Sequence, residues 1–251
     1  MLTTPTRGAW IVGGTSGIGR AVAEALDARG WTVVVSGRSV AELRQTSERR
    51  WEARVDVTRS DVVDAAHRRI SETIPIDAVV NCAGGSESGS VNDLTDEQWS
   101  TAIETKLLGY VRVCRTVLPG LAQRNGGLVN VIGSAAAVAT GNYALGSLAA
   151  ALAHITRGIA QEWCPQGVRV FGLNPGPTET DRLTGLIQTR ARADHVSQDE
   201  ARANLTSAMY RRRPLLPHEI ASTVADLLGP GGVALSGAIL LADGGATGGW
   251  I

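Results

Sequence analysis

Short apolar runs rich in β-branched residues recur along the chain and alternate with longer segments of helical pattern. The runs predict strands at Ala9–Val12, Trp31–Ser36, Arg54–Val57, Ala78–Val80, Leu128–Ile132, Arg169–Leu173 and Ile239–Leu241. Several runs are apolar almost throughout, which indicates burial on both faces of the strand. The alternation of strands and helices therefore predicts an α/β fold built on a doubly wound parallel sheet.

One segment interrupts this alternation. Residues 181–214 are polar and rich in arginine, and Pro214 and Pro217 close the segment. An insertion at the carboxyl edge of a parallel sheet is well placed to cover a ligand, so we predict a substrate lid here, with a simple surface excursion as the alternative. No repeat, linker or low-complexity tract divides the chain, so residues 1–251 are predicted to form a single domain.

Composition narrows the classes of function. The 24 acidic and 24 basic residues cancel, which argues against binding to nucleic acid or to an anionic membrane. The chain shows neither the apolar stretch of a signal peptide nor a run of the roughly 20 residues that a membrane helix needs, so we expect a cytoplasmic protein. Cys82, Cys114 and Cys164 are far apart and lack metal-ligand spacing, so we expect free thiols and no metal site.

A glycine-rich turn follows the first predicted strand. It reads Gly13-Gly14-Thr15-Ser16-Gly17-Ile18-Gly19 and opens a helical segment. Glycines permit a tight turn and a close approach of the backbone, while the start of a helix offers free N–H groups and a positive dipole end to a pyrophosphate. Directly after the first strand of a β-α-β unit, such a turn favours a dinucleotide-binding site over a purely structural bend.

The second predicted strand ends at Ser36-Gly37-Arg38. A cofactor with a free ribose 2′-hydroxyl favours a carboxylate at this place, whereas a guanidinium can donate two hydrogen bonds to a 2′-phosphate. Because neither Ser36 nor Gly37 is acidic, the sequence favours NADP(H) over NAD(H). A solvated Arg38 is the alternative in a chain so rich in arginine.

Five segments, in order along almost the whole chain, together resemble the short-chain dehydrogenase/reductase family. They are the turn Gly13–Gly19, Val55-Asp56-Val57, Asn81-Cys82-Ala83-Gly84, Asn174-Pro175-Gly176-Pro177-Thr178-Glu179-Thr180 and Leu241-Ala242-Asp243-Gly244-Gly245. The resemblance implies a Rossmann-type domain, a homo-oligomer (tetramer or dimer) and an oxidoreductase that acts on a small molecule. It also implies cofactor contacts from Gly13, Thr15, Ser16, Gly17, Ile18, Gly19, Arg38, Asp56, Val57, Asn81, Ala83, Gly84, Pro175, Gly176, Thr178 and Thr180.

The catalytic residues of the family carry over only in part. In the family, an Asn on the central helix, a Ser after the fifth strand and a Tyr-x-x-x-Lys on the next helix cooperate in proton transfer. Ser134 matches the serine, with a strand-end turn residue as its alternative. An ungapped match of the next helix places Leu145 and Ala149 at the tyrosine and lysine positions, so both functional side chains are replaced.

Tyr143 is a candidate for the missing tyrosine. It lies two residues before the expected position, which is about 200° around the helix from Leu145 at about 100° per residue. Tyr143 therefore points elsewhere if the helix has already begun, and reaches the site only from the loop before it. A packing role near the helix start is the alternative.

Lys106 is the only lysine of the chain, and the resemblance places it where the family has the Asn that faces the catalytic centre. On its predicted helix it falls roughly 20° beyond an apolar stripe that includes Ile103, Leu107 and Tyr110. That position suits a surface lysine or one that reaches into a cleft. We predict that Lys106 enters the gap left at Ala149, where a low-dielectric pocket would lower its pKa enough for proton transfer.

These residues favour an NADP(H)-dependent reductase with a non-standard active site. Hydride addition to a ketone produces an alkoxide that needs a proton donor, and the usual tyrosine is missing. Hydride addition to an iminium neutralises an existing charge, and reduction of a conjugated alkene produces an enolate that Lys106, Ser134 or water can stabilise. We therefore expect an imine or conjugated enone as substrate. A non-redox isomerase, lyase or cyclase and a catalytically silent nucleotide-binding partner are the alternatives.

Overall fold

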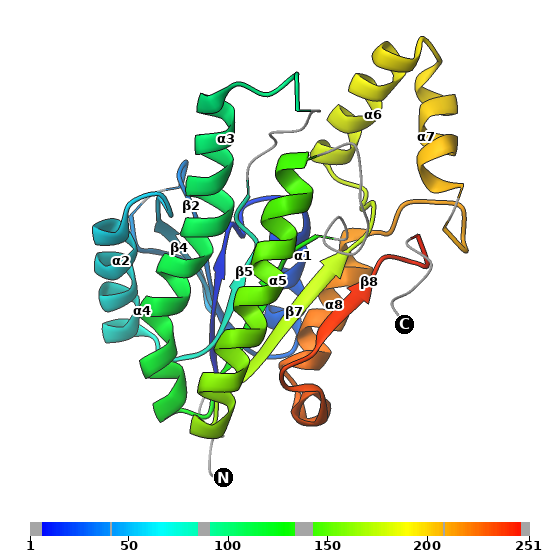
Figure 1. The fold of residues 1–251 in the computed structure, drawn as a ribbon. Helices are drawn as coiled ribbons and strands as arrows, with labels where there is room; N and C mark the ends of the chain where they lie inside the picture. The colour runs from blue at the N-terminus through cyan, green and yellow to red at the C-terminus, as the bar shows by residue number, and fades with distance from the viewer. Residues whose placement is uncertain (1–6, 41, 85–90, 134–142, 208, 247–251) are drawn as a thin grey trace.

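A single sheet lies between two layers of helices in the computed structural model of the chain (Figure 1). The structure describes residues 7–40, 42–84, 91–133, 143–207 and 209–246. The strands are β1 (Gly8–Val12), β2 (Thr32–Gly37), β3 (Arg44–Ser47), β4 (Arg50–Arg54), β5 (Ile76–Asn81), β6 (Gly127–Val131), β7 (Arg169–Pro175) and β8 (Ile239–Ala242). The helical segments are α1 (Gly17–Ala28), α2 (Ser60–Thr73), α3 (Asp96–Ala102), η1 (Ile103–Leu108), α4 (Gly109–Gln123), α5 (Tyr143–Trp163), η3 (Cys164–Gln166), α6 (Asp181–Asp194), α7 (Gln198–Thr206), α8 (Pro217–Leu227) and η4 (Pro230–Leu235).

The strands follow the order β3-β4-β2-β1-β5-β6-β7-β8, and β3 alone pairs antiparallel with its neighbour. Chain order reverses at β1, which lies between β2 and β5. In open parallel sheets such a switch point creates a crevice at the carboxyl ends of the strands, where ligands bind. The doubly wound parallel sheet predicted from the sequence is confirmed, and its switch point marks the edge at which a ligand site is expected.

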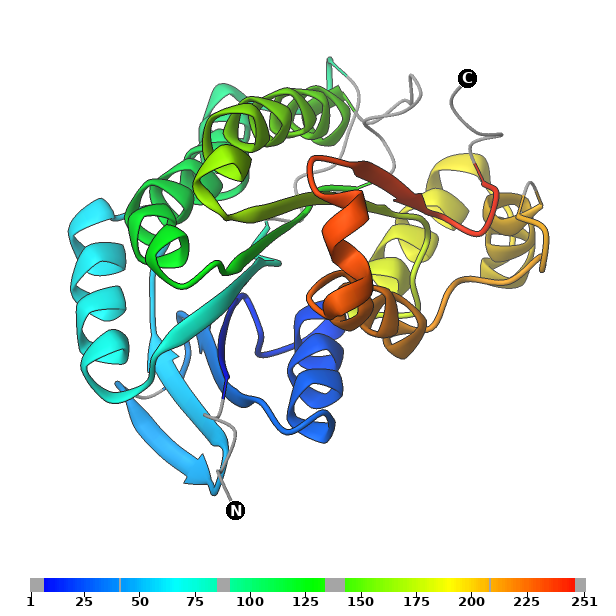
Figure 2. The ribbon, with the colours of Figure 1, turned by 90° about the horizontal axis from the view of Figure 1, so that it is seen from below.

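Both faces of the sheet are buried. Figure 2 shows α1 and α8 on one face and α2, α4 and α5 on the other. Along β1, Ala9 and Ile11 pack in the core beneath α1 and α8, whereas Trp10 and Val12 pack beneath α2 and α4. Because successive side chains of a strand point to opposite faces, a strand covered on both faces has to be apolar throughout. This explains the continuous apolar runs of the sequence.

One predicted strand is misplaced. The sequence suggested Arg54–Val57, but β4 ends at Arg54, where it pairs with Gly37 of β2. Val55 and Val57 are buried beyond the end of the strand, where the Val55 N–H still donates to the Gly37 carbonyl of β2 at 3.0 Å, so the apolar run continues past the last residue of β4. The edge strand β3 was not predicted at all, because all of its residues are exposed and no apolar periodicity announces it.

Residues 181–214 contain the helical hairpin of α6 and α7, which stands above the carboxyl edge of the sheet, apart from the two main layers (Figure 1). The two helices have a small apolar core of their own, formed by Leu183, Ile187, Ala191 and Ala201. The hairpin is therefore a compact unit beside the expected ligand site.

The three cysteines of the chain are free, as the sequence predicted. Cys114 is buried, and Cys82 and Cys164 are half-buried. Within the described ranges, no cluster of His, Cys, Asp and Glu side chains could hold a metal ion. None of the described helices combines the length and the apolar character that crossing a membrane requires.

Candidate active site at the carboxyl edge of the sheet

A buried chain of hydrogen bonds ties β5 and β6 to α5 near the switch point. Asn81 Nδ2 donates to Asn130 Oδ1 at 2.9 Å, and Asn130 Nδ2 donates to Thr156 Oγ1 at 3.0 Å. The Thr156 hydroxyl then donates to the Leu152 carbonyl at 2.7 Å. Because buried amides are costly to leave unpaired, this network fixes the relative positions of the three elements. The Nδ2 atom of Asn81, a predicted cofactor contact, is engaged within it, whereas its buried Oδ1 has no partner among the described residues.

Lys106 lies buried at the same edge, with 7% of its surface exposed. Its Nζ donates to the Val131 carbonyl, at the end of β6, at 2.8 Å and to the Tyr110 hydroxyl at 3.0 Å. From the sequence, both a surface and an inward position were open for Lys106, because a regular α-helix with about 100° per residue was expected there. Lys106 belongs to η1, a π-helical segment whose wider turn changes that angle, and such segments are frequent at functional sites. The inward position is the one that the structure shows.

The environment of Lys106 disfavours its charge. Burial lowers the pKa of the Lys106 amine to about 7, and the positive charge of Arg182 acts in the same direction. The Cys82 thiol acts in the opposite direction, but burial raises its own pKa to about 12, so it stays protonated near neutral pH. Among the described residues no carboxylate pairs with Lys106. Amine and ammonium are therefore both populated near pH 7.

Open space remains beside the amine at Gly84. A Cβ built on Gly84 would lie 3.5 Å from Lys106 Cδ and 3.8 Å from both Lys106 Nζ and Arg182 Nη1. Arg182 comes from the first turn of α6, so the helical hairpin contributes a second cation close to the lysine. Gly84, which the resemblance gave as a cofactor contact, thus leaves room between the side chains of Lys106 and Arg182.

Tyr110 is a site residue that sequence reasoning missed. Its hydroxyl lies 2.8 Å from both the Asn81 and the Val131 carbonyls and accepts the hydrogen bond from Lys106. The side chain is 1% exposed and shares an apolar cluster with Ala149 on α5. We predicted that Lys106 would enter the gap at Ala149. In the structure the Tyr110 ring lies in that cluster, and the Lys106 nitrogen lies beside Gly84.

The other two predicted catalytic residues are placed differently. Ser134 lies outside the described residues. Tyr143 is the first residue of α5 and is half exposed, and within the described part of the chain its hydroxyl has no hydrogen-bond partner. Lys106 is thus the one predicted catalytic residue that the structure places in a buried polar setting.

The glycine-rich turn joins β1 to α1 as the sequence predicts. Gly13 and Gly17 adopt left-handed φ values of 79° and 51°, which favour glycine. The N-cap residue Ser16 makes no side-chain hydrogen bond to α1, so it leaves the N–H groups of the first turn to an anion. A Cβ on Gly17 would lie 3.3 Å from Thr180 Cγ2, so the start of α6 lies against this turn.

A pocket of about 680 Å³ lies beyond the end of β2 and is lined in part by arginines. Two of them are engaged with carboxylates, Arg59 with Asp61 and Arg69 with Glu42, each at 2.8 Å. Arg38 also lines the pocket and forms no ion pair with any residue that the structure describes. Its exposed guanidinium is therefore available to a phosphate group.

Asp56 lines the same pocket, and Val57 follows it in the segment after β4. The Asp56 carboxylate accepts hydrogen bonds from the Thr58 backbone at 3.0 Å and from the Thr58 hydroxyl at 2.8 Å. Burial opposes ionisation of Asp56, but these hydrogen bonds and the charge of Arg38 leave the pKa of its carboxyl lowered. Val57 is buried, which holds the segment in place.

The predicted cofactor contacts Pro175, Gly176, Thr178 and Thr180 lie where β7 passes into α6, and Ala83 lies just after β5. β7 ends at Pro175, and the buried Thr178 hydroxyl donates to the Gly176 carbonyl at 2.8 Å. Thr180 is the N-cap of α6, and its hydroxyl accepts from the Leu183 N–H at 3.4 Å. These hydrogen bonds fix the local turns of the segment, and the contact of Thr180 with Gly17 places the start of α6 beside the glycine-rich turn.

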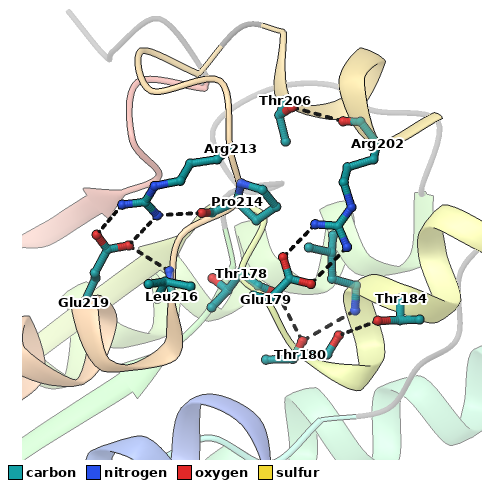
Figure 3. Close-up of polar contacts among 11 residues, drawn as sticks. Thr178, Glu179, Thr180, Thr184, Arg202, Thr206, Arg213, Pro214, Leu216 and Glu219 are labelled. Carbon is teal, nitrogen blue, oxygen red and sulfur yellow. Dashed lines mark hydrogen bonds and ion pairs between the residues drawn. The ribbon is translucent and has the colours of Figure 1, made fainter. Parts of the chain in front are cut away.

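Two forked ion pairs fasten the helical hairpin at its ends (Figure 3). Arg202 of α7 donates to both carboxylate oxygens of Glu179 at 2.7 and 3.0 Å. Arg213 donates to both oxygens of Glu219 at 3.0 and 2.7 Å, and the Leu216 N–H also donates to Glu219. The segments that lead into and out of the hairpin are therefore both held by two-point contacts.

Comparison with known proteins places the chain in a family. The family described as enoyl-(acyl carrier protein) reductase matches residues 12–247. A putative ketoacyl reductase of Streptomyces coelicolor is 30% identical, with 98% of each chain covered, and 3-oxoacyl-[acyl-carrier-protein] reductase of Vibrio harveyi is 31% identical, with 94% of this chain and 96% of the relative covered. A solved structure of a variant of actinorhodin polyketide ketoreductase with NADPH is 28% identical, covers 98% of this chain and 99% of its own, and has a TM-score of 0.90. The chain therefore belongs to the short-chain dehydrogenase/reductase family of oxidoreductases, as its motifs indicated.

The lowered pKa of Lys106 makes stability depend on pH. Between about pH 7 and pH 9 the unfolded chain keeps a proton on the lysine that the folded chain has lost, so the free energy of unfolding should rise with pH, by up to about 1.4 kcal/mol per pH unit. The variant Lys106→Met should lack this rise. Urea unfolding of both proteins at pH 7, 8 and 9 measures the difference, and parallel profiles would contradict the buried, neutralised amine.

Proposed function

We propose that this chain is an NADP(H)-dependent reductase that acts on a conjugated enone or an imine of a small molecule. The observation that carries the proposal is a buried amine of lowered pKa at the switch point of a short-chain dehydrogenase/reductase fold. The enoyl reductase description of the matching family supports a conjugated double bond as the reacting group. Because relatives of the chain are named as ketoacyl reductase and polyketide ketoreductase, ketones are the substrates to be tested beside enones and imines.

The residues at the carboxyl edge fit NADP(H) as the cofactor. The N–H groups in the first turn of α1 would bind the pyrophosphate, and the Arg38 guanidinium would bind the 2′-phosphate. Thr178 and Thr180 stand at the nicotinamide end of the crevice, on the segment between β7 and α6. When bound, NADPH supplies a hydride.

Lys106 would stabilise the substrate atom on which negative charge develops. In an enone, negative charge gathers on the carbonyl oxygen as the β-carbon is reduced, and an ammonium group beside it stabilises that charge and then donates a proton. The Lys106 nitrogen keeps the electron pair of the broken N–H bond and regains a proton from solvent. An imine that is already protonated needs no such donor, which makes it the other substrate class that this site suits.

The helical hairpin of residues 181–214 is proposed to act as a lid over this site. Its first turn carries Arg182 close to Lys106, and Thr180 lies against the glycine-rich turn, so a bound cofactor would contact its base. NADPH should therefore slow trypsin cleavage after the arginines of α6 and α7 severalfold. Mass spectrometry of timed digests identifies the cut sites, with cleavage after the exposed Arg44 of β3 as the internal control. Equal rates with and without NADPH would contradict the lid.

Arg38 should determine the preference for NADPH. The substitution Arg38→Ala removes the guanidinium that would pair with the 2′-phosphate, so NADPH should bind at least tenfold more weakly while NADH binding changes little. Calorimetric titration with each nucleotide measures both affinities. Arg44→Ala, an exposed arginine of the edge strand, is the matched control and should change neither. Equal weakening of NADPH and NADH by Arg38→Ala would count against this assignment.

The reaction itself is tested with NADPH that carries deuterium at the transferable position. An enone should gain deuterium at its β-carbon, an imine at its former C=N carbon, and Lys106→Met should lower kcat for the enone about 100-fold or more. Arg115→Met, on the exposed side of α4, is the control and should retain full activity. Turnover without deuterium in the product would indicate a non-redox enzyme. Reduction of ketones alone would replace the proposed substrate class.

A further inference from the structure

We propose that Tyr110 positions Lys106 and that the two side chains form the proton-transfer unit of this site, a Lys-x-x-x-Tyr pair that spans η1 and α4. In the family the corresponding pair is a Tyr-x-x-x-Lys on the helix that follows, where this chain has Leu145 and Ala149. The pair proposed here comes from the opposite helix, and its roles are exchanged. Lys106 faces the reacting atoms, and Tyr110 holds it. The inference rests on the proposed function.

Hydrogen-bond counting supports the positioning role. A tyrosine hydroxyl has one hydrogen to donate, and that of Tyr110 has the Asn81 and Val131 carbonyls within 2.8 Å. Its oxygen is then left to accept the hydrogen bond from Lys106 at 3.0 Å, while Lys106 also donates to Val131. Two of the three N–H directions of the Lys106 ammonium are therefore fixed. Among the described residues no group occupies the third direction, and we assign it to a substrate atom beside Gly84.

The ring of Tyr110 is held rigidly enough to do this. It is 1% exposed and packs in one cluster with Ile132, Ala149 and Leu152. The small side chain of Ala149 leaves room for the ring on the α5 side. The Lys106 nitrogen lies 4.5 Å from the centre of the same ring, a distance at which the ring face attracts a cation. Tyr110 thus contacts the lysine through both its hydroxyl and its ring.

Few other ionisable groups act on the pair. Those that face it within the described residues are Cys82 at the end of β5, Cys114 one turn further along α4 and Arg182 at the start of α6. Burial raises the pKa of each thiol to about 12 and holds that of the Tyr110 hydroxyl well above its ordinary range. Near neutral pH the proton that moves is therefore the one on Lys106, and Tyr110 keeps its own.

The proton step can be written without a further reactant. As the substrate oxygen of an enone becomes negative, the N–H bond of the Lys106 ammonium in the free direction breaks and its proton passes to that oxygen. The nitrogen keeps the electron pair, and its two remaining N–H bonds stay directed at Val131 and Tyr110. Water returns a proton to the amine before the next turnover.

The single lysine of the chain makes a direct test possible. In protein labelled with ¹³C-lysine, one Cε signal reports the ionisation of Lys106, with neither cofactor nor substrate present. Tyr110→Phe keeps the ring but removes the oxygen that accepts from the ammonium, so the lysine should titrate about one pH unit lower than in the wild type. Tyr210→Phe, a tyrosine that is 85% exposed, is the matched control and should not move the titration. An unchanged titration in Tyr110→Phe would overturn the pairing.

A second measurement covers the case in which Tyr110→Phe does not fold. In wild-type protein labelled with ¹³C-tyrosine, the Tyr110 Cζ signal should shift with the same midpoint as the lysine, and this shift should disappear in Lys106→Met. A Tyr110 Cζ signal that does not shift at the midpoint of the lysine titration would overturn the pairing.

Activity separates this inference from the proposed function. In Tyr110→Phe the loss of enone reduction at high pH should begin about one pH unit earlier, with KM for NADPH unchanged, because the ammonium that donates the proton is lost earlier. A coupled pair in a protein that reduces neither enones nor imines would refute the function and leave the pair intact. An active enzyme whose pH profile does not change in Tyr110→Phe would refute the pair alone.

Discussion

The hydrogen bond from Lys106 to the Val131 carbonyl is the interaction around which the site is organised. It brings an amine into the protein interior at 2.8 Å from the end of a central strand, with no carboxylate partner among the described residues. A buried cation without a counter-charge is costly, so the group lowers its pKa and becomes able to exchange a proton near neutral pH. The missing counter-charge makes the ammonium form of Lys106 costly to bury. The same missing counter-charge lets the amine take up and release a proton in catalysis at this edge.

The rest of the architecture keeps that amine in place. The Asn81–Asn130–Thr156 network aligns the ends of β5 and β6, so the carbonyls that receive Tyr110 and Lys106 stand next to each other. The π-helical turn of η1 points the lysine inward. The switch point at β1 brings the glycine-rich turn to the same edge, and the start of α6 closes over it. Cofactor site and amine are thus consequences of one sheet topology.

The sequence predicted much of this and failed where local geometry or packing decides. The central strands were recognisable because burial on both faces makes them apolar almost throughout, and the turn after β1 was recognisable from its glycine spacing. The hairpin that includes β3 was missed, because exposed residues such as Arg44 carry no hydrophobic signal. The inward position of Lys106 depends on a π-turn, which breaks the 100° periodicity. Tyr110 was assigned to an apolar stripe, since a sequence does not show which carbonyls its hydroxyl meets.

The most direct measurement is a crystal structure of the protein with NADPH and a phenol, a stable mimic of the enolate that enone reduction would produce. If Lys106 faces the reacting atoms, the phenol oxygen lies within about 3 Å of Lys106 Nζ, while Val131 and Tyr110 keep their own hydrogen bonds to that nitrogen. A phenol oxygen bound by other groups, with Lys106 turned away from the nicotinamide, would contradict the claim that this amine faces the reacting atoms.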